Sequence, residues 1–141
     1  MKLGTTEIVV PADWIPASVI LLSPLDTSVA FRANLVMATE SVPDTENPAT
    51  FTENLFKKIQ QTGVKIMIGD APPEEVTLAC GLPGAITERV VLGQKNERVR
   101  QMQLVAINKG TAFVLTMSHL DGAAFDKMKT TFRNICLNFT P

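Results

Sequence analysis

Ser118, His119 and Asp121 are the residues whose types and spacing come nearest to a catalytic site. A serine, a histidine and an aspartate can serve as nucleophile, base and orienting carboxylate when their side chains meet. These residues end a run typical of a β-strand, in which adjacent side chains point to opposite faces, so Ser118 and His119 point apart. His119 is the only histidine of the chain. We therefore expect a structural role for it and predict no catalytic residue.

Patterns for a metal or a cofactor are also absent from the sequence. Cys80 and Cys136 are far apart, and with one histidine they give no zinc-site spacing. The acidic segment 39–48 lacks the spacing of a calcium loop. No glycine-rich loop that could hold a phosphate leads into a helix. We expect no metal, no cofactor and no enzyme activity.

Composition limits the class of protein further. The chain has 141 residues, 13 basic against 14 acidic, and a net charge of −1, which does not predict nucleic-acid binding. No apolar run is long enough to span a membrane, and the N-terminal residues lack the pattern of a secretory signal. Two distant cysteines fit a reducing compartment. We expect one domain over 1–141, located in the cytoplasm and not inserted in a membrane.

Short apolar runs separated by Gly, Pro and Asp predict antiparallel strands. The expected strands are 6–10, 18–22, 32–39, 64–69, 75–80, 85–92, 99–107 and 111–118. Asn47 and Pro48 are typical of a helix N-cap and first helical position, and Gly63 is the expected C-terminal stop of that helix. A second helix is expected after Asp121, which is another N-cap candidate.

The segment 100–120 predicts a hairpin whose two turn residues are Lys109 and Gly110. This register pairs Met102 with Met117, Leu104 with Leu115 and Ala106 with Phe113. On the opposite side it pairs Gln101 with Ser118, Gln103 with Thr116, Val105 with Val114 and Ile107 with Ala112. A three-residue loop would pair Val105 with Phe113 and mix the two classes, so the pattern favours the two-residue turn.

The sheet is therefore expected to have two unlike faces. The large-residue face holds Leu35, Met37, Met102, Leu104, Phe113, Leu115 and Met117. The mixed face holds Asn34, Val36, Gln101, Gln103, Val105, Val114 and Thr116, extended by Thr87 and Arg89. Glu88 breaks the pattern and needs a partner or the sheet edge. We expect the large-residue face to be the core under a helix, and the mixed face to be covered by the second helix or by a partner.

The order of these elements resembles the DcrB/LpqN-like family, within the Mog1/PsbP-like fold. "EIVVPADW" resembles the family's opening strand with its proline and tryptophan, and "SVILLSP" and "FRANLVMATE" resemble its second and third strands. "RQMQLVAINKGTAFVLTMSHL" resembles its long hairpin, and "FDKMKTTFRNICLNF" its closing helix. The usual serine-phenylalanine ending is Asn138 and Phe139 here. The resemblance covers nearly the whole chain.

The resemblance implies an α+β fold, an α/β/α sandwich with a predominantly antiparallel sheet and two main helices. It implies no catalytic residues. The bacterial, cytosolic Eag chaperones of type VI secretion are similar in form, and they shield transmembrane helices of effectors, commonly as dimers. This likeness implies a protein partner and a homodimer.

The seven mixed-face residues named above are the expected partner-binding surface, because small side chains admit a helix backbone and amides can hydrogen-bond it. A soluble adaptor that docks on a folded partner, and a carrier of a small apolar ligand, are the alternatives.

Overall fold

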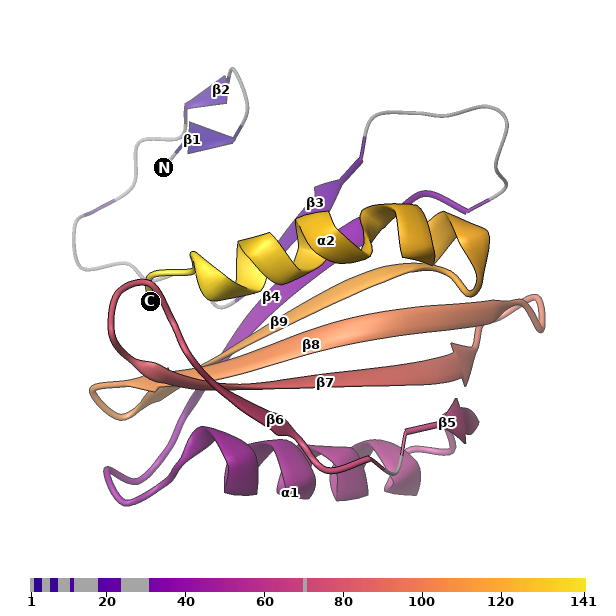
Figure 1. The fold of residues 1–141 in the computed structure, drawn as a ribbon. Coiled ribbons are helices and arrows are strands. Elements are labelled where there is room, and N and C mark those ends of the chain that lie inside the picture. The colour runs from indigo at the N-terminus through magenta and orange to yellow at the C-terminus, as the bar shows by residue number, and fades with distance from the viewer. Residues whose placement is uncertain (1, 4–5, 8–10, 12–17, 24–30, 70) are drawn as a thin grey trace.

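The protein is an antiparallel sheet held between two helices, one on each face (Figure 1). The computed structural model describes residues 2–3, 6–7, 11, 18–23, 31–69 and 71–141. The helices are α1 (Pro48–Gln61) and α2 (Ala123–Leu137). The predicted α+β sandwich with two main helices is confirmed.

Seven strands form the main sheet. They are β3 (Ser18–Leu22), β4 (Asn34–Ser41), β5 (Ile66–Ile68), β6 (Glu74–Thr77), β7 (Pro83–Leu92), β8 (Arg98–Asn108) and β9 (Thr111–Leu120). Their spatial order is β3-β4-β9-β8-β7-β5, with β6 also paired to β7, and every pairing is antiparallel. Two short strands, β1 (Lys2–Leu3) and β2 (Thr6–Glu7), pair separately.

The strand predictions are confirmed in number and order across the main sheet, with ends displaced by a few residues. The strand expected over 75–80 ends at Thr77, because Leu78 and Gly81 form a turn in which the Gly81 N–H donates to the Leu78 carbonyl. Of the strand expected over 6–10, residues 8–10 lie outside the described residues. The strand β1 was not predicted.

The β8–β9 hairpin has the predicted register. Asn108 pairs with Thr111, which leaves Lys109 and Gly110 as the turn. Their φ angles are 48° and 74°. Two consecutive positive φ angles give the turn type whose twist matches that of the flanking strands. All seven cross-strand pairs that the pattern predicted are present, so the two faces of β8 and β9 are assigned correctly.

The large-residue face is the main core and lies under α2; we call it the α2 face. Met102, Leu104 and Met117 are completely buried there, and Phe125 and Phe132 of α2 pack against them. The apolar side chains on this face of the strands thus pack against the apolar side of α2, whose apolar positions recur every three or four residues. The predicted core face is confirmed.

The mixed face lies on the side of α1, and we call it the α1 face. The Asn47 side chain caps α1 by accepting from the Thr50 N–H at 2.9 Å, as predicted. Phe51 and Leu55 of α1 then pack on Val105 and Ala112 of the sheet. The expectation that the second helix would cover this face is wrong, because α2 follows β9 directly and folds back over the opposite face.

The prediction that Asp121 caps the second helix is also wrong. The cap position is Gly122, with a φ of 96° and no side-chain cap. Because β9 extends to Leu120, Asp121 lies beside β8 and accepts hydrogen bonds from Arg98 and Arg100. The Asp121 carboxylate therefore links the end of β9 to β8.

Glu88, which broke the face pattern, has partners on the α2 face. Its carboxylate lies 3.5 Å from the Arg100 guanidinium and 3.0 Å from the Lys129 ammonium of α2. These ion pairs lie at the end of the α2 face, where their side chains are partly exposed to solvent.

Candidate functional site

One end of the α1 face is left without a helix and forms an open groove. The helix α1 packs on Val105 and Ala112 at the other end of the face, and the part around Val36, Gln101 and Thr116 remains open. The groove encloses about 680 Å³. Its lining consists of Phe31, Asn34, Val36, Val91, Val99, Gln101, Thr116 and Ser118, with the turn residues Gly93, Gln94, Lys95 and Glu97 at the rim.

Four of the seven residues predicted to bind a partner line this open groove. They are Asn34, Val36, Gln101 and Thr116. Gln103 and Val105 are buried, with exposures of 3% and 0%, and Val114 packs against the cluster around Phe51. These last three residues belong to the part of the face that α1 closes.

The sequence interpretation missed part of the groove. Ser118 stood on the mixed face in the predicted register, opposite Gln101, and that pairing was the signal that could have identified it. Phe31 precedes β4, and the rim residues belong to the β7–β8 turn. These residues lie outside the strands, so the alternation of side chains along a strand does not predict that they line the groove.

A hydrogen-bonded network crosses three strands at the floor of the groove. Arg89 donates through Nε to Gln101 Oε1 at 2.8 Å and through Nη1 to Gln103 Oε1 at 3.3 Å. Gln101 Nε2 donates to Ser118 Oγ at 3.2 Å, and Gln103 Nε2 donates to Thr116 Oγ1 at 2.9 Å. We call these five residues the Arg89 network.

The chemistry of Arg89 fixes the orientation of this network. A guanidinium only donates hydrogen bonds, so both glutamines must present their oxygens to it and their amide hydrogens to the hydroxyls. Ser118 and Thr116 then act as acceptors and keep their own hydroxyl hydrogens for another acceptor. Since Ser118 and Thr116 line the groove, its floor can donate to an occupant.

Arg89 is a buried charge with neutral partners in this network. Its exposure is 7%, and burial lowers the pKa of its guanidinium below the ordinary value. An arginine still remains protonated in a protein at neutral pH. Within the part of the chain that the structure describes, no carboxylate forms an ion pair with it.

The edge strand β3 extends the apolar surface beside the groove. Ile20 pairs with Val36 and Leu22 pairs with Asn34, so both side chains lie on the α1 face. Ile20 is 66% exposed and Leu22 is 55% exposed. Large apolar side chains on an exposed sheet edge are typical of an interaction surface.

The three residues with catalytic types do not converge. Ser118 belongs to the Arg89 network, whereas the His119 ring stacks on Phe31 with centroids 6.2 Å apart. Asp121 is held by Arg100 and Arg98, and the Arg100 hydrogen bond is the main reason why the pKa of this carboxyl is lowered. The prediction that Ser118 and His119 point apart is confirmed by the register, which places them on opposite faces.

Over the ranges given above, no three His, Cys, Asp or Glu side chains are grouped as metal ligands would be. Neither α1 nor α2 is long and apolar enough to cross a membrane.

Comparison with known proteins identifies the fold. No protein-family model matches the chain, and no curated protein sequence matches it. A protein of unknown function from Pseudomonas aeruginosa, PA94, thought to be a regulator, has a similar structure with a TM-score of 0.65 and 10% identity. That match covers 100% of this chain and 94% of PA94.

Two other solved structures are similar. The cyanobacterial PsbP protein, CyanoP, of Synechocystis sp. PCC 6803 gives a TM-score of 0.54 at 15% identity, over 86% of this chain and 80% of CyanoP. LpqN of Mycobacterium tuberculosis, which is involved in cell envelope biogenesis, gives a TM-score of 0.45 at 17% identity, over 96% of this chain and 83% of LpqN. The sheet order, the two helices and the likeness to CyanoP show that this chain has the Mog1/PsbP-like fold.

Proposed function

We propose that this chain is a non-enzymatic protein-binding domain whose open groove receives an apolar helix of a partner. The resemblance of the sequence to the DcrB/LpqN-like family and its Eag branch suggests the finer form of the proposal. In that form the protein is a bacterial cytoplasmic chaperone or adaptor that shields helices of a type VI effector before secretion.

The observation that carries this proposal is the unusual floor of the groove. Gln101, Thr116 and Ser118 are oriented by hydrogen bonds of the Arg89 network, in which the two hydroxyl oxygens accept and their hydrogens stay available to an occupant. Val36, Val91 and Val99 lie around them and supply apolar surface. Valine side chains can pack on an apolar helix, and the two hydroxyls can donate to its carbonyl oxygens.

The exposed apolar edge beside the groove supports the same partner chemistry. Ile20 and Leu22 continue the α1 face from β4 onto β3, and an occupant seated over Val36 would also bury them. Burial of such side chains is worth roughly 25 cal/mol per Å² of apolar surface. The groove and the edge strand together therefore provide a surface longer than the groove alone.

The test uses a defined helix in place of an unknown partner. The probe is a synthetic apolar helix of about 20 residues, built from leucine, alanine and glycine, flanked by lysines and labelled with a fluorophore in mild detergent. We expect saturable binding to the wild-type protein by fluorescence anisotropy. Val36→Asp places a charge on the groove floor, where an apolar helix would desolvate it, and we expect affinity to fall at least about tenfold.

Val64→Asp is the matched control. Val64 is 43% exposed and lies between α1 and β5, so this variant carries the same substitution outside the groove. It should bind the probe as the wild type does. Gln103 and Val114 are unsuitable for the test, because both contribute to the closed part of the face. Equal binding by Val36→Asp and Val64→Asp would show that the groove is not the site.

Failure of the wild-type protein to bind the helix would contradict the chaperone form. The adaptor alternative would then be favoured by binding to a folded effector domain. The resemblance also adds a homodimer to the proposal, which sedimentation equilibrium would measure directly.

A further inference from the structure

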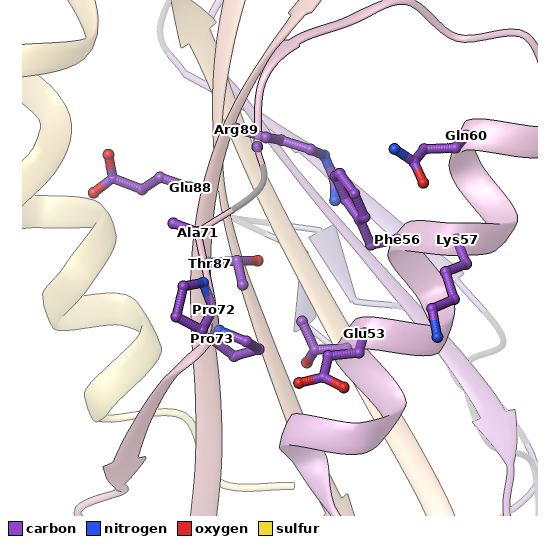
Figure 2. Close-up of a pocket in the computed structure, with 12 residues that line it drawn as sticks. Glu53, Phe56, Lys57, Gln60, Ala71, Pro72, Pro73, Thr87, Glu88 and Arg89 are labelled. Atoms are coloured by element: carbon purple, nitrogen blue, oxygen red, sulfur yellow. The ribbon is translucent and has the colours of Figure 1, made fainter.

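A second hollow lies on the α1 face, on the other side of the Arg89 network from the open groove. It is bordered by α1, β7 and the segment that leads into β6 (Figure 2). Its volume is about 380 Å³. Phe56, Gln60, Pro72, Pro73, Thr87 and Arg89 are among its lining residues. We call it the Arg89 pocket.

The pocket owes its shape to a close approach of the chain at Gly69. A Cβ at this position would lie 3.1 Å from the Phe56 ring and 3.2 Å from the Arg89 Cβ. Glycine therefore lets the chain after β5 pass close to α1 and β7. The two prolines that follow, Pro72 and Pro73, stiffen the wall of the pocket.

The charge inside this pocket is a buried cation. Figure 2 shows the Arg89 side chain extending from β7 toward Phe56 of α1. Its hydrogen bonds go to two neutral amide oxygens, those of Gln101 and Gln103. A buried guanidinium with neutral partners has lost hydration that an anion would restore in large part.

The acidic residues that the structure describes at the pocket, Glu53 and Glu88, do not supply that anion. Glu88 points away from the other labelled residues in Figure 2 and is paired with Arg100 and Lys129 on the α2 face. Glu53 lies at the end of the pocket remote from Arg89 and is exposed. Lys57, also exposed on α1, adds a second positive charge to the rim.

We propose that the Arg89 pocket binds a small monocarboxylate with a short apolar chain. The carboxylate oxygens would accept hydrogen bonds from the Arg89 guanidinium, and the apolar chain would pack on Phe56, Pro72 and Pro73. A mostly apolar pocket with one buried charged group matches how proteins hold such ligands, and its volume lies within their usual range. This site does not depend on the helix-binding groove.

The test is titration of the isotope-labelled protein with sodium hexanoate, followed by NMR. We expect saturable shifts of the Arg89 Nε–H signal and of the Thr87 and Ala71 amide signals. Hexanamide has the same apolar chain without the charge, and it should bind at least about tenfold more weakly, since a charge-assisted hydrogen bond is lost.

Variants separate a specific site from general attraction to a cation. Arg89→Met removes the charge at similar length and should weaken hexanoate binding at least about tenfold. Lys109→Met removes a distant, exposed charge in the β8–β9 turn and should leave binding unchanged. If Arg89→Met does not fold, Thr87→Leu reduces the pocket volume while keeping Arg89, and it should also weaken binding.

Three results would overturn the proposal. One is equal binding of hexanoate and hexanamide; another is hexanoate binding that neither Arg89→Met nor Thr87→Leu weakens. The third concerns Asp70, which lies outside the described residues. If its carboxylate neutralised Arg89, hexanoate would bind Asp70→Asn and not the wild-type protein.

Discussion

The two faces of the sheet differ in how completely a helix covers them. On the α2 face, α2 contacts β8 and β9 at the centre of the sheet, and Met102, Leu104 and Met117 are fully buried. On the α1 face, α1 contacts β7 and β8, toward one edge, and Val36 and Thr116 remain accessible in the open groove. Two helices of nearly equal length, 14 and 15 residues, therefore leave very different parts of their sheet faces uncovered. Position over the sheet, rather than helix length, decides what stays available for binding.

The polar groups of the two faces differ in the same way. On the α2 face, Glu88, Arg100 and Asp121 neutralise one another at an end that solvent reaches. On the α1 face, Arg89 is surrounded by neutral amides between two hollows. The charged groups of the α2 face are paired with one another, whereas on the α1 face the described residues leave hydrogen-bond donors and a cation that none of their carboxylates pairs with.

The strongest way to test this contrast is to place the same carboxylate on each face. Leu104→Asp buries a charge among apolar side chains, which costs several kcal/mol, comparable with the whole stability of a small domain. We expect it to abolish cooperative urea unfolding followed by circular dichroism. Val36→Asp should change the free energy of unfolding by no more than about 1 kcal/mol, because the groove is open to water. Similar behaviour of both variants would contradict the difference between the faces.

A smaller effect should come from the Arg89 network. Gln103→Leu removes an acceptor for the buried guanidinium and the donor to Thr116, so we expect a loss of about 1–3 kcal/mol in the free energy of unfolding. Thr116→Val keeps the shape and removes one hydroxyl, and it should cost about 1 kcal/mol or less. Urea midpoints would measure both. A more stable Gln103→Leu would mean that the network is a net cost, retained for binding.

The smallest effect is a pH dependence at the charged end of the α2 face. The hydrogen bond from Arg100, together with that from Arg98, lowers the pKa of Asp121 in the folded protein. Its stabilising effect is then fully present above the unfolded-state pKa of about 4 and is lost as pH falls through the lower folded-state pKa. We expect Asp121→Asn to cost about 1 kcal/mol at pH 7.

Measuring thermal stability from pH 7 downward tests this sign. The curves of the wild type and Asp121→Asn should converge at acid pH, because the wild-type carboxyl becomes neutral there. A difference that stayed constant down to pH 2 would show that the loss in the variant comes from packing rather than from charge.

Much of the fold and part of the site follow from local sequence patterns. The hairpin register followed from matching Leu104 with Leu115 and the glutamines with hydroxyls, since one residue of slip would mix the faces. Asn47 and Pro48 marked the start of α1 because a cap acts within one turn. Alternation along the strands likewise placed Asn34, Val36, Gln101 and Thr116 on one face, and the structure brings these four together in the open groove.

What failed depended on contacts between distant segments. Asp121 has the residue type of a helix cap, but the extension of β9 places it next to Arg98 and Arg100. Its carboxylate accepts charge-assisted hydrogen bonds from these two arginines, which are stronger than a bond to a backbone N–H at the helix start. Gln103 and Val114 have the same residue character as their neighbours in the groove, and only the position of α1 closes them off.

By itself the sequence determined the strands, their pairing and the unlike character of the two faces, because side-chain alternation and turn chemistry act over a few residues. The tertiary structure alone decided which helix covers which face, where the α1 face stays open, and that Arg89 lies beside a pocket built from α1 and the chain after β5. Helix placement depends on packing between segments far apart in the chain, which local periodicity does not encode.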